Sequence, residues 1–250
     1  MRTFDELIAE GSAVPVEGWD FSWFTGRATE QRPPWGYADL LGRQMAGARR
    51  AVDLQTGGGE VLAGIASAPP LLVATEGWPP NAALAARRLA PLGGRVLRSA
   101  EDADLPFVDD CFDLVTSRHP TVVRWPEVAR VLAPGGTYLS QQIGPDSVGE
   151  LRDFLTGPQP VRDDQRPEWI RAAATDAGLR VVDLRSATLR MEFFDIAAVV
   201  VFLRKVVWTV PGFTVERFRD RLAALHRRIA ADGVFVAHSR RVLVQACRPR

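Results

Sequence analysis

Short apolar runs alternate with segments of helical spacing between Arg49 and Ile143, and this alternation constrains the fold more than any other feature. The runs are RAVDL, LLVATE, GRVLRS, FDLVTS and GTYLSQQI. Segments such as NAALAARRLAPL and WPEVARVL lie between them and repeat apolar residues every three or four positions. Strands that alternate with helices form a parallel sheet covered on both faces. We therefore expect an α/β fold with a doubly wound, mostly parallel, seven-stranded sheet.

The chain departs from this alternation at both ends. Residues 1–47 combine a short amphipathic helix, FDELIAEG, with an aromatic, proline-rich stretch that has no strand pattern. After Ile143 we expect helices at Ser147–Leu155, Pro167–Ala177, Asp195–Val207 and Thr214–Ala231, and strands near Leu179–Leu184, Thr188–Phe193 and Val234–Cys247. The last strands are expected to supply an antiparallel edge. The predicted organisation is a segment at 1–47 and a domain at 48–250, with a helical insertion at about 194–232.

Charge and composition exclude several classes of protein. Lys and Arg number 31 against 30 Asp and Glu, so no net positive field attracts nucleic acid or anionic lipid. The N-terminus lacks the apolar region of a signal peptide, and the longest apolar run, IAAVVVFL, is too short to span a bilayer of about 30 Å. Cys111 and Cys247 lie far apart without metal-ligand spacing. We expect a cytoplasmic protein without a membrane partner, a nucleic-acid partner or a metal.

A glycine cluster follows the first of the apolar runs. A strand that ends at Asp53 continues into QTGGGE, at the sheet edge where open α/β sheets bind ligands. The G-x-G-x-x-G spacing of a dinucleotide site is absent, and so is the lysine of a phosphate-binding P-loop. Glu60 follows the glycines directly and is a poor neighbour for a diphosphate. The loop is therefore typical of a site for a cationic or neutral cofactor.

The stretch VDLQTGGGE resembles the first motif of class I S-adenosylmethionine-dependent methyltransferases. Glu76 lies 17 residues after Gly59, where that family places the acid that binds the ribose hydroxyls. EDADLPFVDDCFDLVTS and ARVLAPGGTYLSQQ are similar to two later blocks of the family. These blocks follow one another in the family's order between Arg49 and Gln142.

The resemblance implies a Rossmann-like fold and S-adenosylmethionine as the cofactor. The positions that it assigns to the cofactor are Asp53, Gln55, Thr56, Gly57, Gly59, Glu76, Gly77, Trp78, Glu101, Asp102 and Ser117. Gln55 stands where the family most often has a glycine. Either Gln55 adopts ordinary dihedral angles and points its amide at the cofactor, or the site is weakened. Glu101 and Asp102 compete for the position whose acid reaches the adenine amine.

The catalytic candidates follow the fourth strand of the domain, in TSRHP. In this family the carboxyl end of that strand borders the substrate. His119 is our candidate general base or orienting group, because imidazole titrates near neutral pH. The alternative is a hydrogen-bonded turn residue before Pro120. Arg118 is expected to orient an acidic substrate or to pair with a local acid.

Tryptophans supply the candidate substrate pocket. In this family the N-terminal segment and the insertion before the last strand are the usual places for substrate lids. The predicted pocket residues are Trp19, Trp23, Trp35, Gln142 and Trp208. Core packing is the competing interpretation of each tryptophan.

The interpretation that combines these features is a methyltransferase of the small-molecule branch, similar to bacterial type 11 methyltransferases without an assigned substrate. We expect an oxygen or carbon acceptor, because the motif typical of amine methylation is absent, and a monomer or homodimer. One alternative is a catalytically silent protein that binds S-adenosylmethionine or S-adenosylhomocysteine. A less favoured alternative is an RNA methyltransferase, which would need a basic face that this chain lacks.

Overall fold

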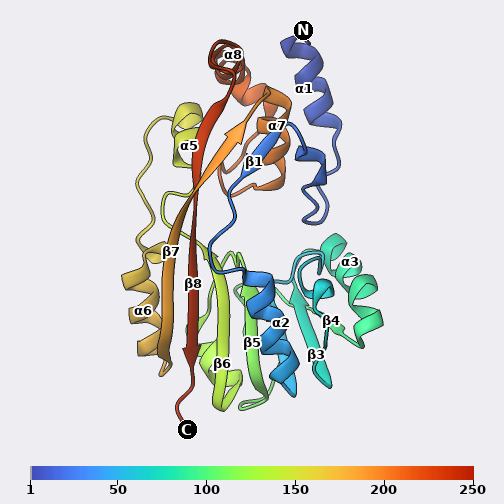
Figure 1. Cartoon of the computed structure of the whole chain (residues 1–250), viewed down its shortest axis with the longest axis vertical. Helices are drawn as coiled ribbons and strands as arrows, with labels where there is room; N and C mark the ends of the chain where they lie inside the picture. Colours follow the sequence, from blue (N-terminus) through green and yellow to red (C-terminus); the bar gives the residue numbers. More distant parts are fainter. Residues whose placement is uncertain (1) are drawn as a thin grey trace. The chain divides into compact units, whose positions relative to one another are not determined.

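The computed structural model describes residues 2–250, and its strands form one eight-stranded sheet in the order β1-β7-β8-β6-β5-β2-β3-β4 (Figure 1). The strands are β1 Ala28–Glu30, β2 Arg50–Leu54, β3 Leu71–Glu76, β4 Arg95–Arg98, β5 Phe112–Arg118, β6 Leu132–Ile143, β7 Arg180–Phe193 and β8 Phe235–Cys247. The five strands from β6 to β4 are parallel, and β8 pairs antiparallel with β6. The predicted mostly parallel α/β fold with an antiparallel edge is confirmed.

The helices alternate with the parallel strands. The α-helices are α1 Phe4–Ala13, α2 Tyr37–Gly47, α3 Pro79–Leu89, α4 Trp125–Val131, α5 Gly149–Thr156, α6 Pro167–Asp176, α7 Ile196–Lys205 and α8 Val215–Asp232. The 3-10 helices are η1 Ser22–Phe24, η2 Leu62–Gly64, η3 Ala90–Leu92 and η4 Asp163–Gln165. Between residues 2 and 250, no helix combines the length and apolar character needed to cross a membrane.

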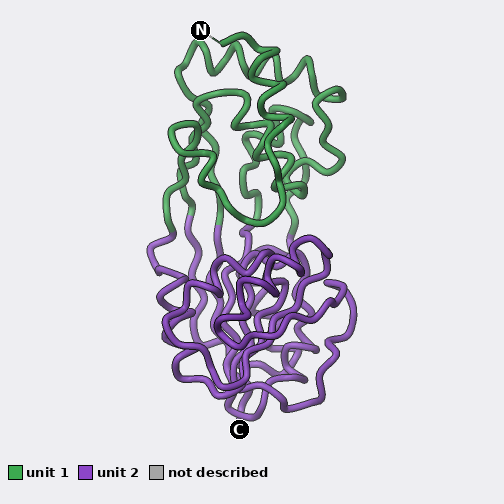
Figure 2. Tube along the Cα trace, turned by 90° about the vertical axis from the view of Figure 1, so that its right-hand side faces the viewer, with its two compact units in different colours: residues 1–32, 145–162, 188–240 green, residues 33–144, 163–187, 241–250 purple. Residues whose placement is uncertain are grey.

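The chain divides into two compact units, which Figure 2 colours separately. Unit 1 comprises residues 1–32, 145–162 and 188–240, and unit 2 comprises residues 33–144, 163–187 and 241–250. Each unit therefore contains three separate stretches of the chain, and β7 and β8 each contribute residues to both units. The predicted boundary at residue 47 remains a prediction.

Unit 2 has an apolar core on each face of its parallel strands. On one face, side chains of η2 and of α2, such as Leu41 and Met45, pack against alternate residues of the strands, such as Leu114 of β5. On the other face, α4 and α6 cover the strands through residues such as Val128 and Ile170. This two-sided burial explains why the strand sequences are almost continuously apolar.

Unit 1 forms its own core around α7, whose sequence IAAVVVFL is buried along its whole length. α1 approaches α7 closely at Gly11, where an added Cβ would lie 2.9 Å from the carbonyl oxygen of Ala197. Asp195 caps the start of α7 by accepting a hydrogen bond from the backbone N–H of Ala198 at 2.8 Å. The apolar run therefore serves as a core helix.

Two strand predictions were wrong. The sheet has eight strands rather than seven, because Ala28–Glu30 pairs antiparallel with residues 191–193 of β7. This strand has three residues and no apolar alternation, so periodicity could not reveal it. The strands expected near Leu179–Leu184 and Thr188–Phe193 form the single strand β7.

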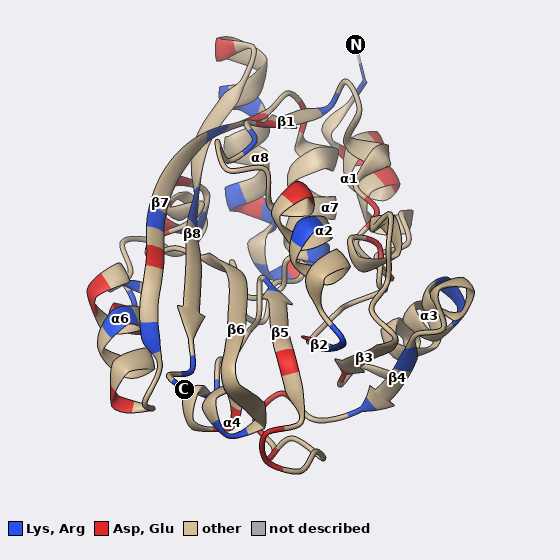
Figure 3. Cartoon of the chain, turned by 60° about the horizontal axis from the view of Figure 1, so that its bottom comes forward, with Lys and Arg blue, Asp and Glu red and all other residues tan. Residues whose placement is uncertain are grey.

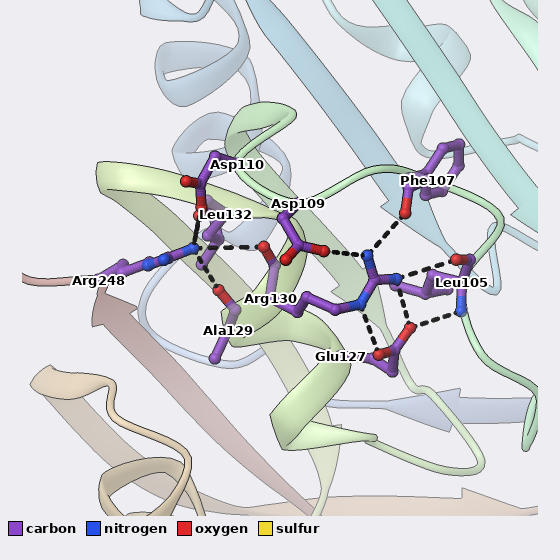
Figure 4. A network of polar contacts seen from close by, with 9 residues as sticks. All are labelled: Leu105, Phe107, Asp109, Asp110, Glu127, Ala129, Arg130, Leu132 and Arg248. Carbon is purple, nitrogen blue, oxygen red and sulfur yellow. Dashed lines mark hydrogen bonds and ion pairs between the residues drawn. The ribbon is translucent and has the colours of Figure 1, made fainter.

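A cluster of charged residues fixes the loop between β4 and β5 (Figure 4). Both carboxylate oxygens of Glu127 accept hydrogen bonds from the guanidinium of Arg130 at 2.7 Å, and one also accepts the backbone N–H of Leu105. The same guanidinium donates to the carbonyl oxygens of Leu105 and Phe107 and to Asp109. The hydrogen bonds from Arg130 lower the pKa of Glu127 to about 2. Glu127 is therefore charged whenever the protein is folded near neutral pH.

We expect Glu127→Gln to lower the free energy of unfolding by about 2 kcal/mol near pH 7, because it removes one charge of a mostly buried pair. The pKa of Glu127 is depressed from 4.5, so its contribution exists above about pH 4.5 and disappears as the pH falls toward 2. Urea unfolding of both proteins across this range measures the difference. If the difference in the free energy of unfolding between the wild type and Glu127→Gln stays constant down to about pH 2, the charge of Glu127 does not cause it.

Candidate functional site

The candidate site lies where three parallel strands end. Leu54 of β2 pairs with Ser117 of β5, and β3 ends nearby at Glu76. Two non-glycine residues with positive φ follow directly: Gln55 at 55° and His119 at 54°. Residues with a side chain rarely adopt this backbone conformation, and those that do are concentrated at functional sites. Both loops, after β2 and after β5, therefore contain a strained residue.

Glu76 holds the glycine loop in place. Its two carboxylate oxygens accept the backbone N–H groups of Gly57 at 2.8 Å and Trp78 at 2.9 Å. Burial raises the pKa of Glu76, and these hydrogen bonds partly offset that rise. Because a carboxylate has about four acceptor positions, Glu76 keeps capacity for further donors.

The glycines after Gln55 are required by geometry. Gly57 and Gly59 have φ values of 63° and 77°. A Cβ on Gly59 would lie 3.2 Å from Cα of Ala85, so the loop packs directly against α3. Arg88 of α3 donates to the carbonyl oxygen of Gly58 at 2.8 Å and to Glu60 at 2.6 Å. This contact explains why Glu60 is tolerated beside the loop.

Asp53 is a buried acid at the end of β2. Its Oδ1 accepts a hydrogen bond from Oγ1 of Thr116 at 2.6 Å. Only 6% of the surface of Asp53 is exposed to solvent. Burial raises the pKa of Asp53 to about 6, against the hydrogen bond from Thr116 and the positive charge of Arg118. At neutral pH the site therefore contains a buried negative charge that favours a cationic ligand.

We expect Asp53→Asn to raise the free energy of unfolding by about 1–3 kcal/mol near pH 8, because it removes a charge that folding must bury. The folded pKa of about 6 lies above the ordinary 3.8, so the cost of Asp53 grows as the pH rises through this interval. Thermal unfolding at about pH 8 and about pH 4 measures it. The gain in the free energy of unfolding is expected to vanish at about pH 4. An equal gain at both pH values would show that the buried charge of Asp53 is not its cause.

Gln55 connects the glycine loop to the loop after β5. Its Nε2 donates to the carbonyl oxygen of Val122 at 2.6 Å, and its Oε1 accepts the backbone N–H of Thr121 at 2.7 Å. The sequence left open whether Gln55 has ordinary dihedral angles. The structure excludes that alternative, because φ is 55°. The amide instead ties the two loops together.

We expect Gln55→Gly to be more stable than Gln55→Ala by about 1 kcal/mol. Both changes remove the hydrogen bonds of the Gln55 amide to Val122 and Thr121. Only glycine also relieves the free-energy cost of the left-handed backbone conformation. Urea unfolding of the two variants measures this difference directly. Equal stabilities would show that position 55 relaxes to a negative φ once its amide is removed.

A cavity open to solvent lies beside the hydrogen bonds of the Gln55 amide. The residues that line it are Leu54, Gln55, Thr75, Ser99, Ala100, Glu101, Ala103, Leu105, Ser117, Pro120, Val122, Val123, Arg124, Glu127, Val128 and Tyr138. Glu101 contacts Thr121 at the rim. The walls are mainly apolar, with a carboxylate at the entrance.

A chain of hydrogen bonds fixes His119. Nε1 of Trp35 donates to Oε1 of Gln141 at 2.8 Å, and Nε2 of Gln141 lies 2.9 Å from Nε2 of His119. An indole N–H only donates, so the amide oxygen of Gln141 faces Trp35 and its amide nitrogen donates to His119. The proton of the imidazole therefore lies on Nδ1.

His119 is held in its neutral form. Burial lowers the pKa of His119 well below its ordinary value, and the positive charges of Arg241 and Arg118 lower it further. Its basic nitrogen already accepts a hydrogen bond from Gln141. This geometry favours the orienting role over that of a general base.

Gln142 and three hydroxyl groups lie on the opposite face of β6 from Gln141. Ser117 Oγ is 2.9 Å from the Tyr138 hydroxyl and 2.8 Å from Ser140 Oγ. Gln142 is 8% exposed, and its buried Nε2 makes no hydrogen bond of ordinary geometry to the described residues, although its amide interacts with the Tyr138 hydroxyl. A buried amide donor with unused capacity is typical of a group that meets a ligand.

The structure brings together most of the predicted cofactor residues, whereas the predicted pocket residues belong to two different units. The cofactor positions predicted from Asp53 to Ser117 lie in unit 2 around the strand ends, and Glu101, but not Asp102, lines the cavity. Trp35 and Gln142 also lie in unit 2, and Trp35 is buried. Trp19, Trp23 and Trp208 pack against the core of unit 1. Their part in a substrate pocket stays a prediction.

Sequence reasoning missed four groups that shape the site. Thr116 donates to Asp53, and Tyr37 donates to the carbonyl oxygen of Ser117 at 2.9 Å. Arg88 holds the glycine loop, and Thr121 donates its backbone N–H to the amide oxygen of Gln55. Of these four residues, only Thr116 could be anticipated, because parallel pairing of β2 with β5 places it beside Asp53, the predicted acid at the strand end.

Comparison with known families supports the assignment of this strand-end site. Residues 52–140 match the family described as a methyltransferase domain. The chain therefore carries a methyltransferase domain over these residues. The matched segment contains the glycine loop, Glu76 and the strand that precedes His119. No curated protein matches the chain.

Solved structures share the fold of this chain. The YcgJ protein from Bacillus subtilis is 16% identical, with a TM-score of 0.58 and coverage of 86% of this chain and 98% of that chain. Geranyl diphosphate methyltransferase, in complex with GPP and sinefungin, is 16% identical, with a TM-score of 0.52 and coverage of 84% and 77%. The [4+2]-cyclase SpnF is 15% identical, with a TM-score of 0.55 and coverage of 97% and 91%. At these identities the likeness concerns the fold alone.

Proposed function

We propose that the chain binds S-adenosylmethionine at the ends of β2, β3 and β5 and transfers its methyl group to an oxygen or carbon atom of a small molecule. The observation that carries the proposal is the placement of Asp53, Glu76 and the positive-φ glycines at one sheet edge, beside a cavity with Glu101 at its rim. A cytoplasmic location, a monomeric or homodimeric state and the absence of a nucleic-acid partner are parts of the same proposal.

The residues present fit this cofactor. Glu76 would bind the ribose hydroxyls, because it keeps acceptor capacity beyond its two backbone partners. The apolar cavity walls Leu105, Val122 and Val123 would hold the adenine, with Glu101 near its amine. Asp53 and the glycine loop would hold the methionine end, where a negative charge complements the cationic groups. Gln55 is the exception, because its amide is bound to the loop after β5.

The remaining residues would orient the acceptor. S-adenosylmethionine, when bound, supplies an electrophilic methyl group on a sulfonium. A displacement of this kind depends on alignment and on exclusion of water. His119 offers the Nδ1–H of a fixed neutral ring, on the sheet face of Gln141. We propose that His119 positions the acceptor and does not remove its proton. The part of Gln142, on the opposite face, stays a prediction.

A second candidate function is binding without methyl transfer. The tie between Gln55 and the loop after β5 and the engagement of Nε2 of His119 both favour it. The fold of the cyclase SpnF resembles that of this chain, so the fold by itself does not require methyl transfer. Cofactor affinity without turnover on any acceptor would support this second function.

Isothermal titration with S-adenosylmethionine and S-adenosylhomocysteine tests the proposal. We expect micromolar binding to the wild type and a loss of at least about tenfold in Glu76→Gln and Asp53→Asn, because each change removes a charged acceptor. Glu168→Gln, on the exposed surface of α6, is the matched control and is expected to bind as the wild type does.

Two results would contradict the proposed site. Absence of binding to the wild type would exclude the cofactor. Unchanged affinity in both site variants would place the cofactor elsewhere. Gln55→Gly is included in the same series. If the hydrogen bonds of the Gln55 amide compete with the cofactor, this variant will bind the cofactor more tightly than the wild type does.

A further inference from the structure

Thr121 connects Glu101 to Gln55 at the rim of the cavity. Its hydroxyl donates a hydrogen bond to Oε2 of Glu101, and its backbone N–H donates to Oε1 of Gln55 at 2.7 Å. Gln55 is held in turn, because its Nε2 donates to the carbonyl oxygen of Val122 at 2.6 Å. All four residues belong to unit 2. The carboxylate of Glu101 is therefore connected to both the loop after β2 and the loop after β5.

The hydroxyl of Thr121 has a single proton and two acceptors within reach. One is Oε2 of Glu101, and the other is Oε1 of Gln55 at 3.2 Å. The carboxylate is the stronger acceptor, because it is charged. Oε1 of Gln55 already accepts the backbone N–H of the same threonine. The hydroxyl of Thr121 therefore donates to Glu101, and its backbone N–H donates to Gln55.

This contact orders a side chain that would otherwise sample several rotamers. Glu101 is exposed and lies in the turn that follows β4, and ordering an exposed glutamate costs conformational entropy. The contact uses only one of its two carboxylate oxygens. Oε1 makes no hydrogen bond to any residue between 2 and 250. Because a carboxylate has about four acceptor positions, Glu101 is held in place and keeps an oxygen for a ligand.

Glu101 lies beside the acid that would bind the ribose. A Cβ added to Gly77, the residue after Glu76, would lie 3.8 Å from Cγ of Glu101. Burial is the main cause of the raised pKa of Glu76, and the charge of Glu101 adds to it. The two carboxylates are therefore neighbours, as two acids that bind one nucleoside have to be.

The backbone at Gln55 indicates that its side chain has a function. Its φ of 55° is a conformation that glycine adopts at lower cost. Residues kept in such conformations are over-determined by their surroundings and are concentrated at functional sites. The surroundings in this case are the loop that carries Thr121, to which both ends of the Gln55 amide are bound.

We propose that Thr121 and Gln55 are positioning residues for the cofactor, which hold the carboxylate of Glu101 where it accepts the amine of the adenine. The inference rests on the proposed function, which places the adenine beside Glu101. It gives the Gln55 amide a supporting role rather than a competing one. A carboxylate that is ordered before binding loses less conformational freedom when the cofactor arrives, so these contacts raise the affinity.

Isothermal titration with S-adenosylhomocysteine measures the effect of the hydroxyl. Thr121→Val keeps the shape of the side chain but removes the hydroxyl, and we expect it to weaken binding about fivefold. Thr121→Ser keeps a hydroxyl and is expected to retain most of the affinity. Thr175→Val makes the same change on the exposed surface of α6, a helix with charges of both signs (Figure 3), and is the matched control without an effect.

A double-mutant cycle shows whether Thr121 acts through Glu101. Glu101→Ala is expected to weaken the binding of S-adenosylhomocysteine by itself, because it removes a charged acceptor. In the Glu101→Ala protein we expect Thr121→Val to cause no further loss, since no carboxylate remains to be positioned. A loss that persists in the Glu101→Ala protein would overturn the proposal, because the hydroxyl would then act on the cofactor by another route.

Gln55→Gly tests the other end of this series of hydrogen bonds. It removes the acceptor of the Thr121 backbone N–H, so we expect hydrogen exchange of that amide to become faster in the protein without ligand. We also expect S-adenosylhomocysteine to bind more weakly, by about as much as in Thr121→Val. Tighter binding to Gln55→Gly would show that the amide competes with the cofactor, and would overturn the proposal.

The two proposals fail in different ways. Absence of S-adenosylhomocysteine binding to the wild type would overturn the proposed function, and this inference with it. Binding that Glu76→Gln weakens and Thr121→Val leaves unchanged would overturn only the positioning role of Thr121 and Gln55, and would leave the proposed function intact.

Discussion

The site depends on the contact between the carboxylate of Glu76 and the backbone N–H of Gly57. It connects the end of β3 to the loop after β2 at 2.8 Å, and the second oxygen of the same carboxylate holds Trp78. Because Gly57 and Gly59 have positive φ, the loop has little rigidity of its own, and Glu76 and Arg88 fix it from two sides. The loop is therefore shaped before any ligand arrives, which reduces the entropy that binding must overcome.

Much of the parallel sheet could be predicted from the sequence, because strands buried on both faces leave continuous apolar runs. The glycine loop and Glu76 could be located for the same reason, since each follows such a run directly. The side-chain partners could not be predicted in this way. Gln55 and Thr121 are 66 residues apart, and their contact depends on the register of β2 and β5 rather than on local pattern. Trp35 shows the same limit. The sequence predicts a pocket or core tryptophan, whereas in the structure its indole N–H determines the orientation of Gln141.

Strain and hydrogen bonding act together at the two loops that follow β2 and β5. Gln55 and His119 both adopt positive φ, and the side chain of each is bound at its far end. The tertiary contacts therefore compensate for unfavourable backbone conformations. In His119 the result is a single tautomer of a neutral ring. In Gln55 it is a fixed spacing between two loops that would otherwise move independently.

The position of β8 has a consequence for folding. β8 is the last strand in chain order, yet it lies between β7 and β6 in the sheet, where Thr137–Ile143 pair with Arg241–Cys247. Pairing across such a separation raises the contact order and slows folding. Until β8 arrives, the hydrogen-bonding edge of β6 is exposed, and an exposed edge pairs readily with strands of other chains. Self-association during folding would therefore begin at β6, whereas in the folded sheet β8 covers that edge from Thr137 to Ile143.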